Sequence, residues 1–312
     1  MVKSRRHQGA KWANKLLFTK QNKLDLKKVE ISDRQQIDKS NNTDVKARNL
    51  SINSANWEDD FGHQWGERFL ATLLLMGQVV VRLLKGKVDS RNIMEHMANV
   101  GLGSLNSVLI IAYFAGMIFT IQSARELIRY GALSAVGGAF ALAFCRELAP
   151  VLTASVVAGQ VGAAFAAEIG EMQVTEQIDA LYMLRTNPID YLVIPRAIAC
   201  CLMLPILSVF SLFAGIGGGV FVAFYFYHLP VEVFLDSVRD FLELKDLFGV
   251  VIKAFVFGGM IAMIGCGWGL TTKGGAKGVS ASTKAAVVTS WVCIFIVDFV
   301  LSLAIFNELS IN

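Results

Sequence analysis

Charge is scarce in this 312-residue chain. Only 17% of its residues are charged, while 54% are hydrophobic. Ordinary soluble domains carry about 25% charged residues, so this composition argues against a soluble globular fold. Several apolar runs also approach the ~20 residues that a helix needs to cross a bilayer. We therefore expect an integral membrane protein with one membrane domain.

The chain also lacks the residue patterns of a metal or redox site. Its five cysteines include no C-x-x-C pair, and its four histidines are scattered. All five cysteines fall in apolar segments, where a reduced thiol behaves as a small apolar side chain. We expect no metal and no cofactor in this chain.

No motif for nucleotide hydrolysis or covalent catalysis is present. The loop GLTTKGGAKGVS is rich in glycine but lacks the G-K-[ST] ending of a phosphate-binding loop. No nucleophile–base arrangement is visible either. We therefore expect a chain that is not an enzyme, with any ATP and magnesium bound by a different subunit, and no nucleic-acid partner.

The N-terminal segment differs from the rest in charge. Residues 1–50 carry a net charge of +8, and the remainder carries −4. Residues 1–60 are poor in apolar side chains, so we expect a disordered tail that is suited to anionic headgroups. No apolar core follows the basic start, which argues against a secretory signal. The absence of acids before Asp25 is compatible with an organelle-targeting peptide, although the later acids fit that less well.

Residues 61–312 are expected to form the membrane domain, an all-α integral membrane fold. Residues 62–86 mix apolar and charged side chains, which favours an interfacial elbow helix over a spanning one. Five transmembrane helices are then predicted, at residues 100–122, 133–167, 191–227, 247–270 and 285–306.

The lysine and arginine residues in the connecting segments predict how the chain is oriented across the membrane. The N-terminal arm and residues 271–284 are basic, whereas the predicted loop 228–246 is acidic. Placing the N-terminus inside puts both basic segments inside and the acidic loop outside. The same alternation places residues 168–190 inside and the C-terminus on the far side.

A ridge of small residues follows the second predicted span. Its members recur every four residues, so they lie along one side of a helix: Ala154, Ala158, Gly162, Ala166 and Gly170. Small residues in such a row allow close helix packing, although glycine and alanine are also common in membrane helices generally. A second row, formed by Gly215, Gly219 and Ala223, suggests packing within the chain or a homodimer contact.

A polar segment follows the ridge. Its apolar residues share one helical face and three others share the opposite face: Val174, Ile178 and Leu181 against Met172, Glu176 and Asp179. The pattern is typical of a short amphipathic helix that lies on its own protein and offers its other face to a soluble partner. A solvated connecting loop is the alternative, and the residues alone do not separate the two.

Arg146 and Glu147 are the costliest residues in the apolar runs. Adjacent helical side chains point about 100° apart, so the two cannot fully satisfy one another. Each charge costs a few kcal/mol unless it meets a partner or water. They form either an interhelical ion pair that stabilises the bundle or the polar lining of a cavity. Gln122, Gln160 and Asp298 are further polar candidates within the spans.

Three stretches resemble the MlaE-type permease family, in particular its cyanobacterial and chloroplast branch: RELAPVLTA, AGQVGAAFAAEIGEMQVTEQIDAL and NPIDYLVIPR. The resemblance covers residues 65–306, and the motif is long and specific. The family consists of membrane subunits of ABC lipid transporters that work with Mce-domain proteins. The resemblance implies a homodimer of this chain, two ABC ATPase subunits and an Mce-domain substrate-binding protein. It places the chain in a cyanobacterial-type inner membrane or a chloroplast inner envelope.

The resemblance also implies roles for particular residues. The Arg146–Glu147 pair matches family residues beside a lipid-binding cavity, and Lys284 is the basic residue nearest to Ala281, where relatives often carry one. The expected lipid-cavity residues are Ile121, Gln122, Arg146, Glu147, Lys284 and Asp298. The expected ATPase-coupling residues are Glu168, Glu171, Met172, Thr175, Glu176, Gln177 and Asp179.

Two other classes of function compete with a lipid permease. An ion-coupled secondary transporter or channel would use Arg146, Glu147 and Asp298 as a charge relay and would need no ATPase. A membrane scaffold would have no transport role, and lipid retained in a dimer cavity would count against it.

Overall fold

The membrane helices dominate the chain. A computed structural model describes residues 90–306 and scattered helical positions between residues 66 and 79. Contacts divide the chain into Met1–Glu67 and Arg68–Asn312, and the membrane helices all belong to the second unit. The predicted tail at residues 1–60 lies outside the described residues, as does much of the predicted elbow segment, so the elbow stays a prediction.

The described part contains five helical segments that are long and apolar enough to span a membrane, and no strand. They are α2 (Ser90–Arg129), a composite second span (Leu133–Val174), η4 with α7 (Ile189–Val193 and Ile194–Tyr227), α9 (Leu244–Leu270) and α10 (Gly275–Phe306). The predicted all-α fold with five spans is confirmed. The spanning part of α2, Asn92–Arg129, has 38 residues and the second span has 42, so both tilt or project beyond the hydrocarbon.

The second span is assembled from short pieces. After the 3-10 turn η1 (Leu133–Ala135), it consists of α3 (Val136–Ala143), η2 (Phe144–Leu148), α4 (Ala149–Val157), η3 (Ala158–Gly162) and α5 (Ala163–Val174). Both η2 and η3 are π-helical turns. A π turn inserts an extra residue into the helix and redirects the side chains around it, and such turns are frequent at functional sites.

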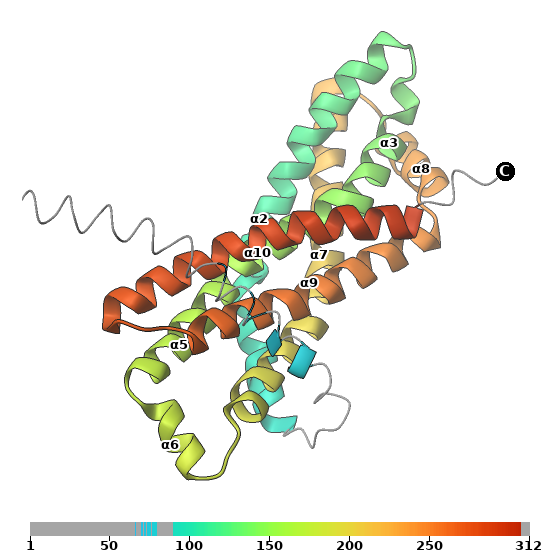
Figure 1. Cartoon of the computed structure of the whole chain (residues 1–312). Helices are drawn as coiled ribbons and strands as arrows, with labels where there is room; N and C mark the ends of the chain where they lie inside the picture. Colours follow the sequence, from blue (N-terminus) through green and yellow to red (C-terminus); the bar gives the residue numbers. More distant parts are fainter. Residues whose placement is uncertain are drawn as a thin grey trace, which may run out of the picture. The chain divides into compact units, whose positions relative to one another are not determined.

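The ridge of small residues packs α5 against α9. All five of its members are buried. A methyl group added at Gly162 would lie 3.1 Å from Cγ2 of Ile261, and one added at Gly265 would lie 2.8 Å from the carbonyl oxygen of Gly162. Glycines on both helices therefore bring the two backbones close together. Figure 1 shows α10 running beside α9, so the second span, α9 and α10 form one packed group.

The second row of small residues is used inside the chain. Gly215 lies against the backbone of Gly116 on α2, and Gly219 lies against Thr120. Ala223 is buried as well. The row packs α7 onto α2, so the alternative that it forms a homodimer contact is wrong.

The predicted acidic loop 228–246 contains a helix, α8 (Val231–Phe241), which corrects that part of the prediction. Phe234, Ser237 and Val238 are its buried residues, at helical spacing. Ser237 Oγ accepts a hydrogen bond of 2.9 Å from the backbone N–H of Gly138, which ties α8 to α3. Pro230 directly before the helix fits a helix start.

The predicted amphipathic segment is divided between two helices. α5 ends at Val174, and Glu176 adopts a left-handed backbone with φ of 61° before α6 (Gln177–Met183) begins. Val174 and Ile178 therefore do not share one continuous helical face. Ile178 is nevertheless buried, while Glu176 and Asp179 are exposed.

Candidate functional site

Charged residues from three spans meet inside the membrane domain. We call them the charge cluster; its members are Arg146 and Glu147 on η2, Asp246 and Lys253 on α9, and Asp298 on α10. The π turn η2 presents two consecutive charged residues, and each takes a different partner on α9. The cluster contains two cations and three carboxylates.

Lys253 is the centre of the charge cluster. Its side chain is fully buried. The ammonium nitrogen Nζ lies 3.0 Å from Oε2 of Glu147 and 2.9 Å from Oδ1 of Asp298. It also donates to Oγ of Ser302 at 2.7 Å. A buried ammonium is tolerated only when such partners replace its hydration, so Lys253 joins the second span, α9 and α10 through one point.

Pro150 explains a further contact of Lys253. In an α-helix, the N–H of residue 150 would bond to the carbonyl of Arg146, but proline has no N–H to donate. That carbonyl instead accepts a hydrogen bond of 2.9 Å from Lys253 Nζ. The proline in the first turn of α4 thus leaves a backbone acceptor for the buried cation.

Arg146 pairs with the beginning of α9. Its Nε lies 2.7 Å from Oδ1 of Asp246, whose side chain is only 2% exposed. The other carboxylate oxygen of Asp246 accepts the backbone N–H of Glu243 at 3.1 Å and caps the helix. Asp246 and Lys253 lie about two turns apart on the same side of α9, which matches the two charges of η2.

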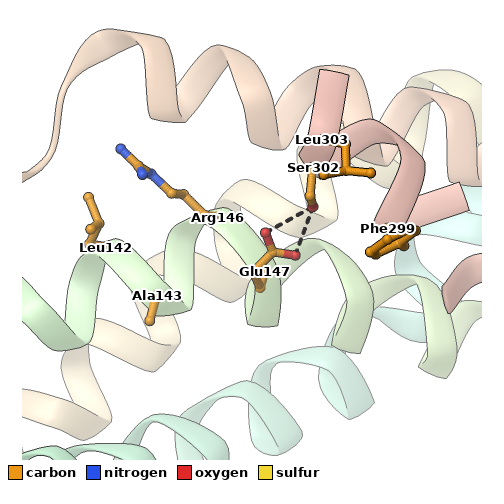
Figure 2. Close-up of a pocket in the computed structure, with 7 residues that line it drawn as sticks. All are labelled: Leu142, Ala143, Arg146, Glu147, Phe299, Ser302 and Leu303. Atoms are coloured by element: carbon orange, nitrogen blue, oxygen red, sulfur yellow. Dashed lines mark hydrogen bonds between the residues drawn. The ribbon is translucent and has the colours of Figure 1, made fainter. Parts of the chain in front are cut away.

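A pocket opens beside the charge cluster. Its volume is about 410 Å³, and its lining consists of Leu142, Ala143, Arg146, Glu147, Phe299, Ser302 and Leu303. Figure 2 shows Glu147 and Ser302 pointing toward one another in direct contact, with Arg146 extending the other way. Ser302 Oγ donates to Oε1 of Glu147 at 3.0 Å. The side chains of Arg146 and Glu147 are 33% and 45% exposed. The pocket therefore combines accessible charged groups with apolar side chains.

Three predicted cavity residues lie apart from this pocket. The carbonyl of Ile121 accepts a hydrogen bond of 3.3 Å from Oη of Tyr227, and Gln122 is exposed on α2. Lys284 is exposed on α10, about four turns and about 21 Å before Asp298 along the helix. Within the part of the chain that the structure describes, none of these three residues lines the pocket. Their predicted role in a lipid cavity is therefore not supported by contacts within one chain.

The predicted coupling residues lie in the last turns of the second span and in the segment directly after it. Glu168 lies on α5, and its Oε2 is 2.9 Å from Nη2 of Arg196 on α7. Glu171 is exposed, Met172 is half-buried, and Thr175 donates its hydroxyl to the carbonyl of Glu171 at 2.8 Å. Glu176 forms the turn, and the first turn of α6 carries the exposed Gln177 and Asp179.

Sequence reasoning missed several residues of this site. Lys253 is a lone cation inside the apolar run 247–270, which is a sufficient signal for a functional position. Asp246 falls in the predicted polar loop, and Ser302 carries no charge to mark it. Arg196, directly after Pro195, is also a cation within a span and is absent from the predicted site.

Comparison with known proteins identifies related chains. A family model described as Permease MlaE matches residues 93–304. A probable ABC transporter permease protein of Synechocystis sp. is 56% identical over 243 residues, covering 78% of this chain and 92% of that protein. A protein of Pyropia yezoensis with the same description is 49% identical, covering 78% and 93%. The Arabidopsis thaliana chloroplastic protein TRIGALACTOSYLDIACYLGLYCEROL 1 is 48% identical, covering 75% and 67%.

Proposed function

This chain belongs to the MlaE permease family, and on that basis we propose that it is the membrane permease subunit of an ABC transporter that moves phospholipid or a related polar lipid. The chain is a multi-pass membrane protein. We propose that it lies in a cyanobacterial-type inner membrane or a chloroplast inner envelope. This setting is suggested by its relatives from Synechocystis and from the Arabidopsis chloroplast.

The pocket beside the charge cluster is the observation that carries the proposal. A polar lipid has a charged or hydrogen-bonding headgroup joined to apolar tails. The pocket offers Arg146 and Glu147 to the headgroup, while Phe299 and Leu303 offer apolar surface to the tails. Charged residues within membrane spans typically mark a substrate pathway, and this pair is partly exposed toward the pocket.

The partners follow from the same family. An ABC transporter hydrolyses ATP, and we propose that this takes place on a separate ATPase subunit that docks near α6. A homodimer of this chain would bring two pockets together, and an Mce-domain protein would deliver or receive the lipid. The exposed side chains of α6 and of the turn before it support the docking site, because they offer both polar groups, at Glu176, Gln177 and Asp179, and apolar surface, at Tyr182 and Met183.

An ion-coupled transporter is the second candidate, favoured by the continuous contacts between Arg146, Lys253 and Asp298. It would act without an ATPase. Lipid transfer between vesicles that requires ATP and a copurifying ATPase subunit would exclude this candidate, and ion flux without either would exclude the lipid transporter.

Glu147→Gln tests the role of the pocket. The substitution keeps the shape of the side chain and removes its charge. Lys253 retains Asp298 and Ser302, and Glu147 is half-exposed, so we expect folding to survive and lipid transfer to fall severalfold. Thermal stability and lipid transfer are measured on the same preparation, with Glu126→Gln on the exposed end of α2 as the control. A marked loss of stability with unchanged transfer per folded molecule would refute the pocket's role.

A further inference from the structure

A second cavity lies between α2 and the later half of the second span. Its volume is about 430 Å³. Its polar lining residues define what we call the second groove: Glu95, His96, Asn99, Gln160 and Glu168. None of them belongs to the charge cluster. Gln160 lies on the π turn η3, as Arg146 and Glu147 lie on η2, so each π turn of the second span carries polar residues of one pocket.

The exposure of these side chains requires an explanation. Asn99, Gln160 and Glu168 are exposed, yet all three lie within helices that span the membrane. Polar side chains in contact with hydrocarbon are costly, so we expect these three to face water, the headgroup region or the polar part of a ligand. Glu95 and Glu168 lie near the span ends at Asn92 and Val174, so the second groove reaches toward the end of these spans nearest α6.

Interactions within the chain hold the second groove in shape. At one end, Nε2 of Gln160 donates to Oγ of Ser107 at 2.9 Å. At the other, Glu168 is paired with the buried Arg196, whose guanidinium lies 5.4 Å from the ring centroid of Phe165. Phe165 in turn makes an edge contact with the ring of His96, at a centroid distance of 6.2 Å. The groove is therefore already formed in the chain without a ligand.

The donors and acceptors of the second groove select a class of ligand. Its two carboxylates, Glu95 and Glu168, repel a phosphate, and the nearby cation Arg196 is already paired with one of them. The amides of Asn99 and Gln160 both donate and accept hydrogen bonds, as sugar hydroxyls do. An ammonium group could use only the acceptors. Val161 and Ala164 add apolar surface beside these groups.

We propose that the second groove binds the uncharged, hydroxyl-rich headgroup of a glycosyl lipid that enters from the leaflet nearest α6. The proposal rests on the function proposed above and adds a second lipid-binding position to it. The charge cluster would serve anionic or zwitterionic headgroups, and the second groove would serve sugars. One permease would then bind two classes of lipid at separate places along the same span.

Lipid retention by the purified transporter complex tests the proposal. The complex is incubated with equal amounts of monoglucosyldiacylglycerol and phosphatidic acid, and retained lipid is measured by native mass spectrometry. We expect Asn99→Leu and Gln160→Leu to lower retention of the glucosyl lipid about five- to tenfold, because each removes hydrogen bonds to its hydroxyls. Retention of phosphatidic acid should not change. Asn106→Leu, an exposed amide on α2 outside the lining of the groove, should change neither.

Four outcomes separate the possible failures. Equal retention of the glucosyl lipid by wild type and both variants would overturn the sugar site, as would retention of phosphatidic acid alone by the wild type. If the wild-type complex retained neither lipid, the result would overturn the proposed function together with the sugar site. Unchanged lipid retention with weakened assembly of the variant complexes would assign the groove to a protein partner and also overturn the proposal. Asn99→Ala, which adds no bulk, repeats the test if either leucine variant fails to fold.

Discussion

At the scale of single residues, Lys253 determines how the charge cluster is held together. It is the fully buried member, and its ammonium contacts groups from the second span and α10. Burying a cation is unfavourable unless its partners are well placed, so the pairs contribute specificity of arrangement more than net stability. Arg146 and Glu147 are more exposed, which leaves them available to a ligand.

Lys253→Met should destabilise the protein strongly. The change removes the cation and leaves the partly buried Asp298, as well as Glu147, without it; breaking a buried pair in this way typically costs about 3–5 kcal/mol. Thermal unfolding of the purified chain measures the loss. Lys277→Met, at an exposed position in the first turn of α10, should have little effect. The double variant Lys253→Met/Asp298→Asn should recover part of the loss, and equal stability of all three variants would contradict the central role of Lys253.

The sequence indicated three of the five members of this cluster. Arg146 and Glu147 stand out in an apolar run, and Asp298 is the lone acid of the last span. Their partners were not predictable in the same way, because which side of α9 faces η2 depends on how three helices are rotated in the bundle. That rotation is fixed by packing between elements. Lys253 alone carried a usable signal, since a lone charge in a span rarely lacks a role.

At the scale of elements, the close contact between α5 and α9 depends on glycine. The predicted ridge is continuous through η3 into α5, and Gly162, the last residue of η3, approaches Gly265 on α9. The π turns themselves were not predicted, because no residue pattern distinguishes a π turn from the α-helix around it. The boundary between α5 and α6 was missed for a similar reason. Glu176 takes the left-handed backbone conformation there, and the sequence signal for that conformation is normally glycine or asparagine.

Gly162→Leu should disrupt the α5–α9 contact. A methyl group there already approaches Ile261, and a leucine would force the helices apart at a cost of about 1–3 kcal/mol or more. Gly159→Leu is a matched control on the same π turn, because a methyl group at Gly159 meets nothing within 4 Å. Expression level and thermal stability of the two variants are compared. Equal behaviour of both would mean that the contact between α5 and α9 is not tight.

Glu176→Lys should weaken binding of the ATPase subunit. Glu176 is exposed in the turn before α6, and reversing a charge at an interface can cost several kcal/mol. We expect assembly of the complex to weaken at least about tenfold and lipid-stimulated ATP hydrolysis to fall while the permease still folds. Glu232→Lys, an equally exposed acid on α8, should leave assembly unchanged. Normal assembly and hydrolysis of Glu176→Lys would exclude docking at this turn.

At the scale of the whole molecule, ATP hydrolysis near α6 would have to reach pockets within the spans. The segment containing α6 leaves the second span after Val174 and returns to the third at η4. The Glu168–Arg196 pair bridges the two ends of this segment, and Nη1 of Arg196 also donates to the carbonyl of Leu192 at 3.1 Å. We therefore expect the Glu168–Arg196 pair to help pass a displacement of α6 to both spans.

Glu168→Gln should separate binding of the ATPase from its coupling to lipid. The change weakens the bridge without removing any surface of α6, so we expect normal assembly and normal basal hydrolysis. A partly exposed ion pair contributes up to about 1 kcal/mol, so the lipid-stimulated increment of hydrolysis should fall about fivefold. Glu126→Gln, an exposed acid on α2 outside the expected coupling residues, is the control and should keep the full increment. Glu168 also lines the second groove, so Asn99→Leu is measured in parallel. An equal loss in Asn99→Leu would assign the effect to the groove, whereas a loss confined to Glu168→Gln would assign it to the bridge.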